Sequence, residues 1–264
     1  MAASLSPVIH NAAFRALELN WIYVPFPVLP GQVLSAIEGL ARAGVRGLNV
    51  TTPHKTHAAG AATTMSAEAA QAKAVNTLVM DGDSIGADNT DGRGLIQFIE
   101  GDLGWSPRDK SVLILGTGGA ARSAAVSLAG AGTSGVALVS RTSVGARTVT
   151  ESLDLPSVKG QTGVSRDDLA TADLVINATP VGAGGESLHL EMAGLKKGAV
   201  VVDLVYQRAV TPLLEEARRL GYEAHNGLGM LLHQAALSFE IWTAVRPPLE
   251  LMSAAAVSHL ARSG

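Results

Sequence analysis

The sequence predicts an α/β protein of two domains, in which a mixed α/β domain precedes a doubly wound domain built on a parallel sheet. The chain has 264 residues, which suits two domains of ordinary size better than one small core. Hydrophobic residues make up 47% of the chain and charged residues 16%, so the composition supports a large core and argues against disorder. Strand-like and helix-like apolar patterns alternate along the chain, and this alternation predicts the fold class.

The first domain is expected to begin with a helix over 6–19, where apolar residues recur at helical spacing and Ser6-Pro7 provides an N-cap and a first-turn proline. The elements expected next are a strand at 21–28, a helix at 30–43, a short strand at 47–50, and strands at 76–80 and 84–87. Asp81-Gly82-Asp83 between the last two strands is typical of a tight hairpin turn. The first sheet should therefore be mixed.

A polar link at 101–110, which contains Pro107, marks the expected domain boundary. The strands expected after it are 112–115, 136–140, 174–178 and 200–204, with helices between them, which predicts a parallel sheet covered on both faces. Two apolar-periodic segments, 228–244 and 248–260, have no strand after them and are expected to pack back across the first domain. The predicted domains are 1–100, completed by helices within 228–264, and 101–227.

Composition also restricts the class of partner. The net charge is −3 with the signs interleaved, which lacks the basic field that nucleic acid or anionic lipid binding needs. Apolar runs are far shorter than the roughly 20 residues that cross a bilayer, so we expect no membrane partner and a cytoplasmic location. The chain has no cysteine, which excludes disulfides, thiolate nucleophiles and Cys-based zinc sites. A small molecule is the expected partner.

A glycine-rich string, Gly116-Thr117-Gly118-Gly119-Ala120-Ala121, follows an expected strand and opens an expected helix. Glycines permit a tight turn, and they let backbone N–H groups at a helix N-terminus approach a pyrophosphate. Taken alone, such a string is equally a turn that joins a strand to a helix. The flanking patterns favour a Rossmann-type dinucleotide-binding domain, with Gly116, Gly118, Gly119 and Ala120 against the cofactor.

Ser140-Arg141-Thr142 stands where an NAD-preferring site usually ends its second strand with Asp or Glu. A guanidinium there pairs with a 2′-phosphate through parallel charge-assisted hydrogen bonds, and the flanking hydroxyls add donors. The string therefore predicts NADP in preference to NAD. The alternative is a solvated loop arginine, and Arg147 is a further candidate for the same contact.

Two strings of polar residues follow strands of the first domain. Asn49-Val50-Thr51-Thr52-Pro53-His54-Lys55 ends one strand, and Asp88-Asn89-Thr90-Asp91-Gly92 follows another. Taken alone, Lys55 and Asp91 are most simply a surface lysine and a helix N-cap. His54 and His57 lie three residues apart, but no third metal ligand accompanies them, so no metal site is predicted.

Together these strings resemble the shikimate dehydrogenase family over nearly the whole chain. The matching strings are Ser4-Leu5-Ser6-Pro7 with His10-Asn11, the two strings ending in Lys55 and Gly92, Ala74-Val75-Asn76-Thr77, the glycine loop, Arg141-Thr142, Asn177-Ala178-Thr179-Pro180, Asp203-Leu204-Val205-Tyr206, and Gly227-Leu228-Gly229-Met230-Leu231 with Gln234. The resemblance implies reversible NADPH-dependent reduction of 3-dehydroshikimate to shikimate, on the pathway to chorismate and aromatic amino acids. It also implies a monomer or a homodimer.

The resemblance assigns roles to individual residues. It implies that Lys55 and Asp91 form the catalytic pair of a substrate-binding first domain. The substrate-binding residues that it implies are Ser4, Ser6, Asn49, Thr51, Asn76, Asp91, Tyr206 and Gln234. Gly227 resembles the position beside the nicotinamide, and Thr179 one near the cofactor ribose. The implied substrate positions bear hydroxyl, amide, phenol or carboxylate groups, which suits a ligand rich in hydroxyls because each buried hydroxyl needs a partner.

Two departures from the family pattern and two alternatives accompany this assignment. Family members begin with a strand before the Ser-x-Ser-Pro string, whereas Ser4 here lies three residues from Met1. Either the first sheet lacks that strand, which predicts exposed edges and a looser substrate site, or the true start lies upstream of Met1. Ser140 stands where the family often has Asn. The alternatives are an enzyme acting on quinate or another cyclic polyol acid, and a noncatalytic NADP-binding relative.

Overall fold

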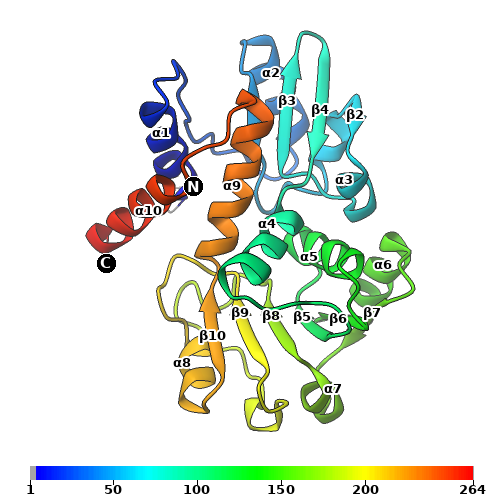
Figure 1. Ribbon diagram of the computed structural model, residues 1–264. Coiled ribbons are helices and arrows are strands. Elements are labelled where there is room, and N and C mark those ends of the chain that lie inside the picture. Colours follow the sequence, from blue (N-terminus) through cyan, green and yellow to red (C-terminus); the bar gives the residue numbers. More distant parts are fainter. Residues whose placement is uncertain (1–3, 264) are drawn as a thin grey trace.

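Two β-sheets form the framework of the chain, which a computed structural model describes over residues 4–263. Figure 1 shows the smaller sheet above the larger one, with α9 (Leu228–Thr243) running alongside from one toward the other. Helices α1 (Ser6–Ala16) and α10 (Leu249–Ser263) lie side by side at the edge of the molecule. The predicted α/β class is confirmed.

The larger sheet has six parallel strands in the order β10-β9-β8-β5-β6-β7. Its strands are β5 (Ser111–Leu115), β6 (Gly135–Ser140), β7 (Val158–Thr162), β8 (Leu174–Asn177), β9 (Val200–Asp203) and β10 (Glu223–Asn226). The four inner strands were predicted because continuous apolar runs are typical of strands buried on both faces. The edge strands β7 and β10 were missed because their residues are partly exposed and largely polar.

Successive residues of the inner strands pack into two separate cores, one on each face of the larger sheet. Val112 and Ile114 pack with α5 (Gly119–Gly130) and α6 (Ser143–Leu153). Leu113 and Leu115 pack with residues of α7 (Arg166–Thr171) and α8 (Pro212–Arg219). This alternation holds the sheet between two layers of helices, as the doubly wound prediction requires.

The smaller sheet has four strands in the order β1-β3-β4-β2 and is mixed, as predicted. Its strands are β1 (Gly47–Asn49), β2 (Thr64–Met65), β3 (Thr77–Asp81) and β4 (Ser84–Asp88), and only the β2–β4 pair is parallel. Gly82 in the β3–β4 turn has φ +58°, which supports the predicted hairpin. The shorter helices beside this sheet are α2 (Val33–Arg42), η1 (Ala58–Ala61) and α3 (Ala67–Ala72).

The predicted strand at 21–28 is wrong. This segment joins no sheet; its main chain is held instead by side chains, since the Asn11 amide exchanges 2.8 Å hydrogen bonds with both the N–H and the C=O of Tyr23. Pro25 and Pro27 cannot donate to a strand ladder, and β1 pairs only with β3, so no strand lies against the segment. Ile22 within it is 76% exposed.

The predicted bounds of the first helix also change. Ser6 is the first helical residue rather than the N-cap, which is Leu5 and makes no side-chain cap. The helix ends at Ala16, not at Leu19, and Glu18 two residues later has φ +52°, a conformation outside the right-handed helix. Pro7 occupies the first turn as expected.

The C-terminal helices pack back onto the N-terminal region, as predicted. Ile9 and Phe14 of α1 share a core with Phe239 of α9 and Met252 of α10. Between the two sheets lies α4 (Asp91–Gln97), which continues as a π-helical turn, η2 (Phe98–Asp102). At Gly94, on α4, a Cβ would lie only 2.6 Å from the backbone nitrogen of Gln234, so α4 and α9 are in direct backbone contact.

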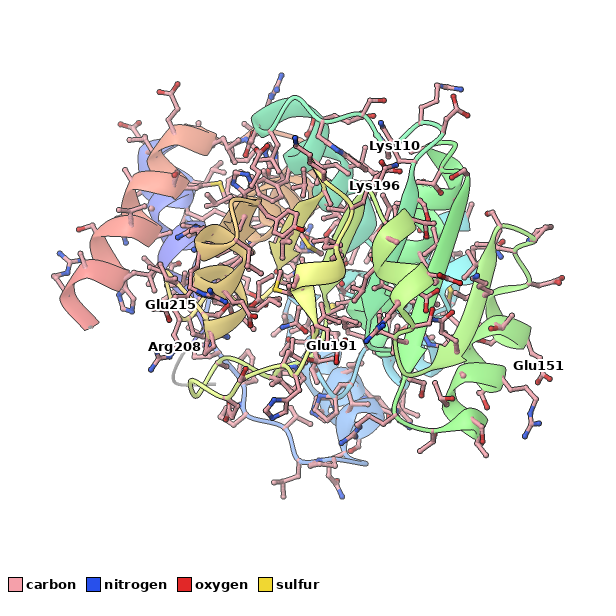
Figure 2. The ribbon with its side chains drawn as sticks, turned by 90° about the horizontal axis from the view of Figure 1, so that it is seen from below. Lys110, Glu151, Glu191, Lys196, Arg208 and Glu215 are labelled. Atoms are coloured by element: carbon pink, nitrogen blue, oxygen red, sulfur yellow. The ribbon has the colours of Figure 1, made fainter. Side chains whose placement is uncertain are left out.

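Charged side chains lie mainly at the periphery of the molecule. Figure 2 shows Glu151, Arg208 and Glu215 pointing outward from different elements, and all three are exposed. Lys196 pairs with Asp173 at 2.6 Å. No helix within residues 4–263 is long and apolar enough to cross a membrane.

Candidate active site

A cleft of about 1470 Å³ lies between the two sheets and receives residues from both. All the residues predicted for the site line it: Ser4, Ser6, Asn49, Thr51, Lys55, Asn76, Asp91, Gly116, Gly118, Gly119, Ala120, Ser140, Arg141, Thr142, Thr179, Tyr206, Gly227 and Gln234. They come from segments far apart in the sequence, so the fold brings both groups of predicted residues to one cavity. Their individual roles remain predictions.

Lys55 and Asp91 form an ion pair between Nζ and Oδ2. Lys55 lies in the loop after β1, where its carbonyl accepts a 2.8 Å hydrogen bond from Val75 N–H. Asp91 is the first residue of α4, and Thr90, not Asp91, is the N-cap. Their side chains are only 13% and 5% exposed, so the pair is shielded from water yet lines the cleft.

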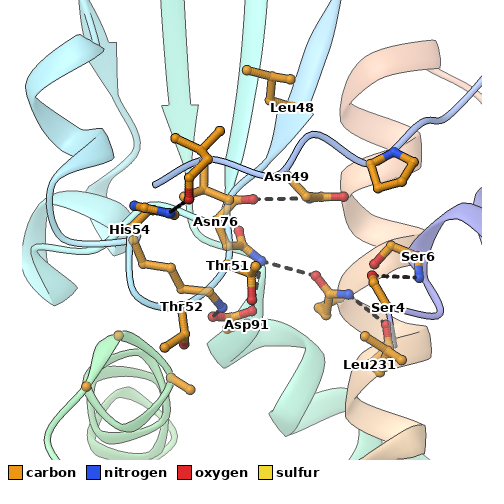
Figure 3. A pocket seen from close by; sticks show the side chains of 18 of the residues that line it. Ser4, Ser6, Leu48, Asn49, Thr51, Thr52, His54, Asn76, Asp91 and Leu231 are labelled. Atoms are coloured by element: carbon orange, nitrogen blue, oxygen red, sulfur yellow. Dashed lines mark hydrogen bonds and ion pairs between the residues drawn. The ribbon is translucent and has the colours of Figure 1, made fainter. Parts of the chain in front are cut away.

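Asn76 connects this pair to α9. Its Nδ2 donates to Asp91 Oδ1 at 2.8 Å and to Gln234 Oε1 at 3.2 Å. Its Oδ1 accepts from the backbone N–H of Thr90 at 2.8 Å, which fixes the orientation of the amide. Figure 3 shows Asn76 and Asp91 in the same cavity as Ser4 and Ser6.

A buried cluster of hydroxyls lies behind Asn76. Thr77 Oγ1 lies 2.7 Å from Ser238 Oγ, and Thr90 Oγ1 donates to the backbone carbonyl of Gln234 at 3.0 Å. Ser238 on α9 is completely buried. These contacts fasten β3, α4 and α9 to one another directly behind the ion pair.

Asn49 is held by the protein on each side of its amide. Its Oδ1 accepts from Tyr23 Oη at 3.0 Å, and its Nδ2 donates to Ser238 Oγ at 3.0 Å and to the carbonyl of Asn76 at 3.1 Å. The ring of His10 stacks on Tyr23, with centroids 4.6 Å apart and planes 4° from parallel. Burial lowers the pKa of His10 to about 3 and raises the pKa of Tyr23, so both rings stay neutral at pH 7.

Ser4 and Ser6 line the cleft at the start of α1, where Ser6 N–H donates to Ser4 Oγ at 3.3 Å. Tyr206 follows β9 and lines the same cleft from the other sheet. Burial raises the pKa of Tyr206, so its phenol is a neutral hydrogen-bonding group. Hydroxyl groups therefore face the cavity from both domains.

The glycine loop fits a dinucleotide. Gly116 has φ +117°, and a Cβ there would lie 3.2 Å from the carbonyl oxygen of Ala178, so this turn requires glycine. A Cβ at Gly118, the N-cap of α5, would meet no protein atom within 4 Å. The loop thus leaves room for a pyrophosphate at the start of a helix whose first N–H groups need acceptors.

The end of β6 fits a 2′-phosphate. Thr142 is the N-cap of α6 and accepts from Gly145 N–H at 3.1 Å, while its own N–H donates to Ser140 Oγ at 3.3 Å. These bonds fix the backbone on both sides of Arg141, whose side chain is exposed and lines the cleft. Ser140, Arg141 and Thr142 therefore all line the cleft at the end of β6, and their contact with a 2′-phosphate stays a prediction.

A second buried network supports the far side of the cleft. Asn177 Oδ1 accepts from Thr179 Oγ1 at 2.7 Å, and Asn177 Nδ2 donates to Asp203 Oδ1 at 2.8 Å. Desolvation raises the pKa of Asp203 against the opposing effect of its hydrogen bonds. A Cβ at Gly227 would lie 2.4 Å from the carbonyl oxygen of Leu204, so only glycine allows this approach.

Comparison with known proteins identifies the family. Residues 1–78 match the model of the shikimate dehydrogenase substrate binding domain, and residues 227–257 match that of the shikimate 5′-dehydrogenase C-terminal domain. A relative from Geobacter sp. (strain M21), shikimate dehydrogenase (NADP(+)), is 42% identical over 272 residues, which cover 100% of this chain and 94% of the relative. The chain belongs to the shikimate dehydrogenase family.

Solved structures confirm the predicted fold of this shikimate dehydrogenase family member. Shikimate 5-dehydrogenase from Thermus thermophilus, in complex with NADP(H) and shikimate, is 31% identical with a TM-score of 0.87, and the match covers 97% of this chain and 95% of that one. Quinate dehydrogenase from Corynebacterium glutamicum, in complex with NAD, is 28% identical with a TM-score of 0.85, covering 97% and 94%.

Several polar residues around the site of this shikimate dehydrogenase family member received no role from the sequence, although Thr77, Asn89 and Thr90 stand in the strings quoted above. Thr77, Thr90 and Ser238 form the buried cluster behind Asn76. Asn89 and Ser123 connect α4 with α5, since Asn89 Nδ2 donates to Ser123 Oγ at 2.7 Å. Serines within apolar helices give no sequence signal of such contacts, because the partners come from distant segments.

Proposed function

We propose that this protein catalyses the reversible NADPH-dependent reduction of 3-dehydroshikimate to shikimate, a step toward chorismate and aromatic amino acids. The observation that carries the proposal is the shielded Lys55–Asp91 ion pair, which lies in the same cleft as the glycine loop. A proton donor beside a bound nicotinamide is what reduction of a ketone requires. The similarity to a shikimate dehydrogenase (NADP(+)) and to a shikimate 5-dehydrogenase solved with NADP(H) and shikimate favours this substrate and NADP.

The protein supplies a proton and an orientation to this reaction. NADPH, held by the glycine loop and Arg141, would supply the hydride that the carbonyl carbon of the substrate receives. The Lys55 ammonium then donates a proton to the carbonyl oxygen, so that the carbonyl becomes a hydroxyl. Asp91 holds the lysine through Oδ2, while Asn76 holds the other carboxylate oxygen. In the oxidising direction the lysine amine accepts the hydroxyl proton.

Polar side chains around this pair suit a hydroxylated ring acid. Ser4, Ser6 and Thr51 line the cleft from the N-terminal region, and Gln234 lines it from α9. We assign these hydroxyl and amide groups to the ring hydroxyls and the carboxylate of the substrate, since each group buried on binding needs a partner. Tyr206 adds a neutral phenol from the opposite side.

The preference for NADP is assigned to the end of β6. The exposed Arg141 guanidinium offers parallel charge-assisted hydrogen bonds to a 2′-phosphate, and Thr142 and Ser140 fix the backbone around it. The glycine loop and the N-terminus of α5 are assigned to the pyrophosphate. An aspartate or glutamate, which would repel that phosphate, is absent from Ser140-Arg141-Thr142.

The test measures NADPH formation by the purified protein with shikimate and NADP⁺. We expect NADPH formation that depends on shikimate, with a higher kcat/KM than for quinate or for NAD⁺. The similarity to a quinate dehydrogenase solved with NAD makes quinate with NAD⁺ the competing pair. A higher kcat/KM on that pair would overturn the proposed substrate, and a protein without turnover on either acid would be the noncatalytic relative.

Three further expectations belong to this proposal. The predicted domains, 1–100 completed by 228–264 and 101–227, assign the substrate to the first and the cofactor to the second. A cytoplasmic location and the choice between a monomer and a homodimer also stay predictions. Fractionation of cells and light scattering from the purified protein test the last two.

A further inference from the structure

We infer that Gly119 and Ser123, in the first turn of α5, position the Lys55–Asp91 pair. This inference rests on the proposed function and assigns to these two residues a role beyond cofactor binding. It makes one turn of the nucleotide-binding side a structural support for the proton donor on the other side of the cleft.

The first observation is the contact between Gly119 and the lysine stem. A Cβ at Gly119 would lie 2.9 Å from Lys55 Cβ, 3.0 Å from Cδ and 3.4 Å from Cγ. Three carbons of one side chain therefore lie against the hydrogen-bearing face of this glycine. Any larger residue would displace the stem near its root, where flexibility of the far end gives no relief.

The backbone of Lys55 has little freedom to move away from such a change. Its carbonyl accepts the 2.8 Å hydrogen bond from Val75 N–H, and its Nζ pairs with Asp91. The lysine is thus held at both ends, and Gly119 bounds the space between them. Moving the stem would displace the ammonium from the carboxylate.

A second observation links the same turn to Asp91. The Gly119 carbonyl accepts from Ser123 Oγ at 2.8 Å, and that oxygen accepts from Asn89 Nδ2 at 2.7 Å. The other end of the Asn89 amide, Oδ1, accepts from Asp91 N–H at 3.1 Å. Ser123 and Asn89 are each only 2% exposed, so water does not compete for these bonds.

The two links together constrain the ion pair from both partners. Gly119 contacts the stem of Lys55 through its Cα. Its carbonyl is connected to Asp91 through the side chains of Ser123 and Asn89. Gly92 reinforces this arrangement, since a Cβ there would lie 2.5 Å from the carbonyl oxygen of Ser123, so α4 and α5 touch directly. Glycine at 119 is therefore required by the lysine, whereas Gly118 has open space at its Cβ position.

The experiment compares Gly119→Ala and Ser123→Ala with two control variants. Gly130→Ala is the control for alanine in α5, because a Cβ at Gly130 meets no atom within 4 Å. Ser35→Ala on α2 is the control for loss of a serine hydroxyl, because that hydroxyl is exposed and donates to the Gln32 carbonyl, away from the cleft. Steady-state kinetics with shikimate and NADP⁺, the pH profile of kcat, and the Kd of NADP⁺ by calorimetry are measured for all four and for the unmodified protein.

We expect kcat to fall at least about 10-fold in Gly119→Ala, because small displacements of reacting groups are costly. In Ser123→Ala we expect a fall of about 3- to 10-fold, the effect of one hydrogen bond. The pH profile of kcat should shift in both variants. In Ser123→Ala, whose hydroxyl lies outside the glycine loop, the Kd of NADP⁺ should stay within about 2-fold of the unmodified protein, because this change removes none of the groups assigned to the cofactor. The controls should match the unmodified protein.

A second measurement does not depend on turnover. Acetylation of Lys55 by acetic anhydride is followed by mass spectrometry, with the exposed Lys73 as the internal reference. Lys55 should react faster in Gly119→Ala because its amine leaves the carboxylate. Unchanged labelling of Lys55 in Gly119→Ala together with unchanged kcat in both variants would overturn the inference, and so would a loss of NADP⁺ affinity in Ser123→Ala as large as its loss of kcat. Absence of turnover in the unmodified protein would instead refute the proposed function, with labelling still testing the position of Lys55.

Discussion

The two sheets supply their polar groups to the cleft in different ways. At the six-stranded sheet, the cofactor-side groups follow β5, β6 and β8, whose ladders are continuous with their neighbours. At the four-stranded sheet, β1 has three residues and one partner strand, and segment 21–28 joins no ladder. There, Asn49 and Asn76 are held by side chains of other elements.

This difference indicates where each half of the site is sensitive to substitution. Backbone ladders and a helix N-terminus form the cofactor half, so single side chains there should alter affinity more than stability. Side-chain hydrogen bonds from α4 and α9 form the substrate half. Loss of one of those side chains leaves buried partners unsatisfied, so stability should fall as well.

The largest effect is expected from loss of the proton donor, which should lower turnover and leave both halves of the site folded. Lys55→Ala should lower kcat about 1000-fold, because a positioned proton donor contributes roughly 10²- to 10⁴-fold. The Kd of NADP⁺ should change little, since the glycine loop is intact. Steady-state kinetics and calorimetry measure both quantities, with the exposed Lys73→Ala as the control. Near-normal turnover would remove Lys55 from the mechanism.

A second prediction concerns the stability of the substrate half in acid. Burial lowers the pKa of His10 from 6.5 to about 3, so between these pH values the unfolded chain binds a proton at His10 and the folded chain does not. The neutral imidazole therefore stabilises the fold fully above pH 6.5. This part of the free energy of unfolding is lost as the pH falls toward 3, at up to about 1.4 kcal/mol per pH unit.

Replacement of this imidazole should make stability less sensitive to acid. The variant His10→Phe keeps a flat ring against Tyr23, and urea unfolding at several pH values between 7 and 4 gives the slope; it should be shallower than for the unmodified protein. His57→Gln, which removes an exposed imidazole, is the control. Equal slopes in all three proteins would show that His10 is not protonated on unfolding in this range.

A smaller effect is expected on the cofactor half. Arg141→Ala should raise the KM for NADP⁺ about 10- to 30-fold, because it removes a charge-assisted contact worth about 1.5–2 kcal/mol. The KM for NAD⁺, the KM for shikimate and the thermal midpoint should stay near their original values. Equal losses for both cofactors would contradict the assignment of Arg141 to the 2′-phosphate.

The smallest effect tests the buried hydroxyls of the substrate half. Ser238→Ala should lower the free energy of unfolding by about 1–2 kcal/mol, because Asn49 and Thr77 lose a buried partner. Denaturant unfolding measures it, with the exposed Ser35→Ala as the control. A change no larger than that of the control would mean that the side-chain network adds nothing to stability.

Sequence patterns predicted the parallel sheet better than the mixed one. Continuous apolar runs identified β5, β6, β8 and β9, because strands buried on both faces consist mostly of apolar residues. The run of aromatic and β-branched residues at 21–28 resembles a strand, yet a strand needs a neighbour to pair with, and Pro25 and Pro27 lack N–H donors. A local pattern carries no information about whether a partner strand is present.

The site shows the same limit. The glycine loop and Arg141 were candidates from local chemistry alone. A glycine-rich turn before a helix suits a pyrophosphate, and a guanidinium suits a 2′-phosphate, whatever the rest of the fold. Lys55 and Asp91 gained their roles from the family resemblance, since each alone is most simply a surface lysine and a helix cap. Ser123 and Ser238 escaped attention because their importance depends on contacts with Asn89 and Asn49, on other elements.

Helix α9 has a consequence for the order in which the protein becomes active during its synthesis. The Gln234 carbonyl accepts from Thr90 Oγ1, 144 residues earlier in the chain, and Phe239 completes the core around Ile9 and Phe14. A nascent chain that has left the ribosome only as far as β10 has every nucleotide-binding strand but lacks the helix that closes its first half. We therefore expect catalytic competence to arrive in one step, late in translation.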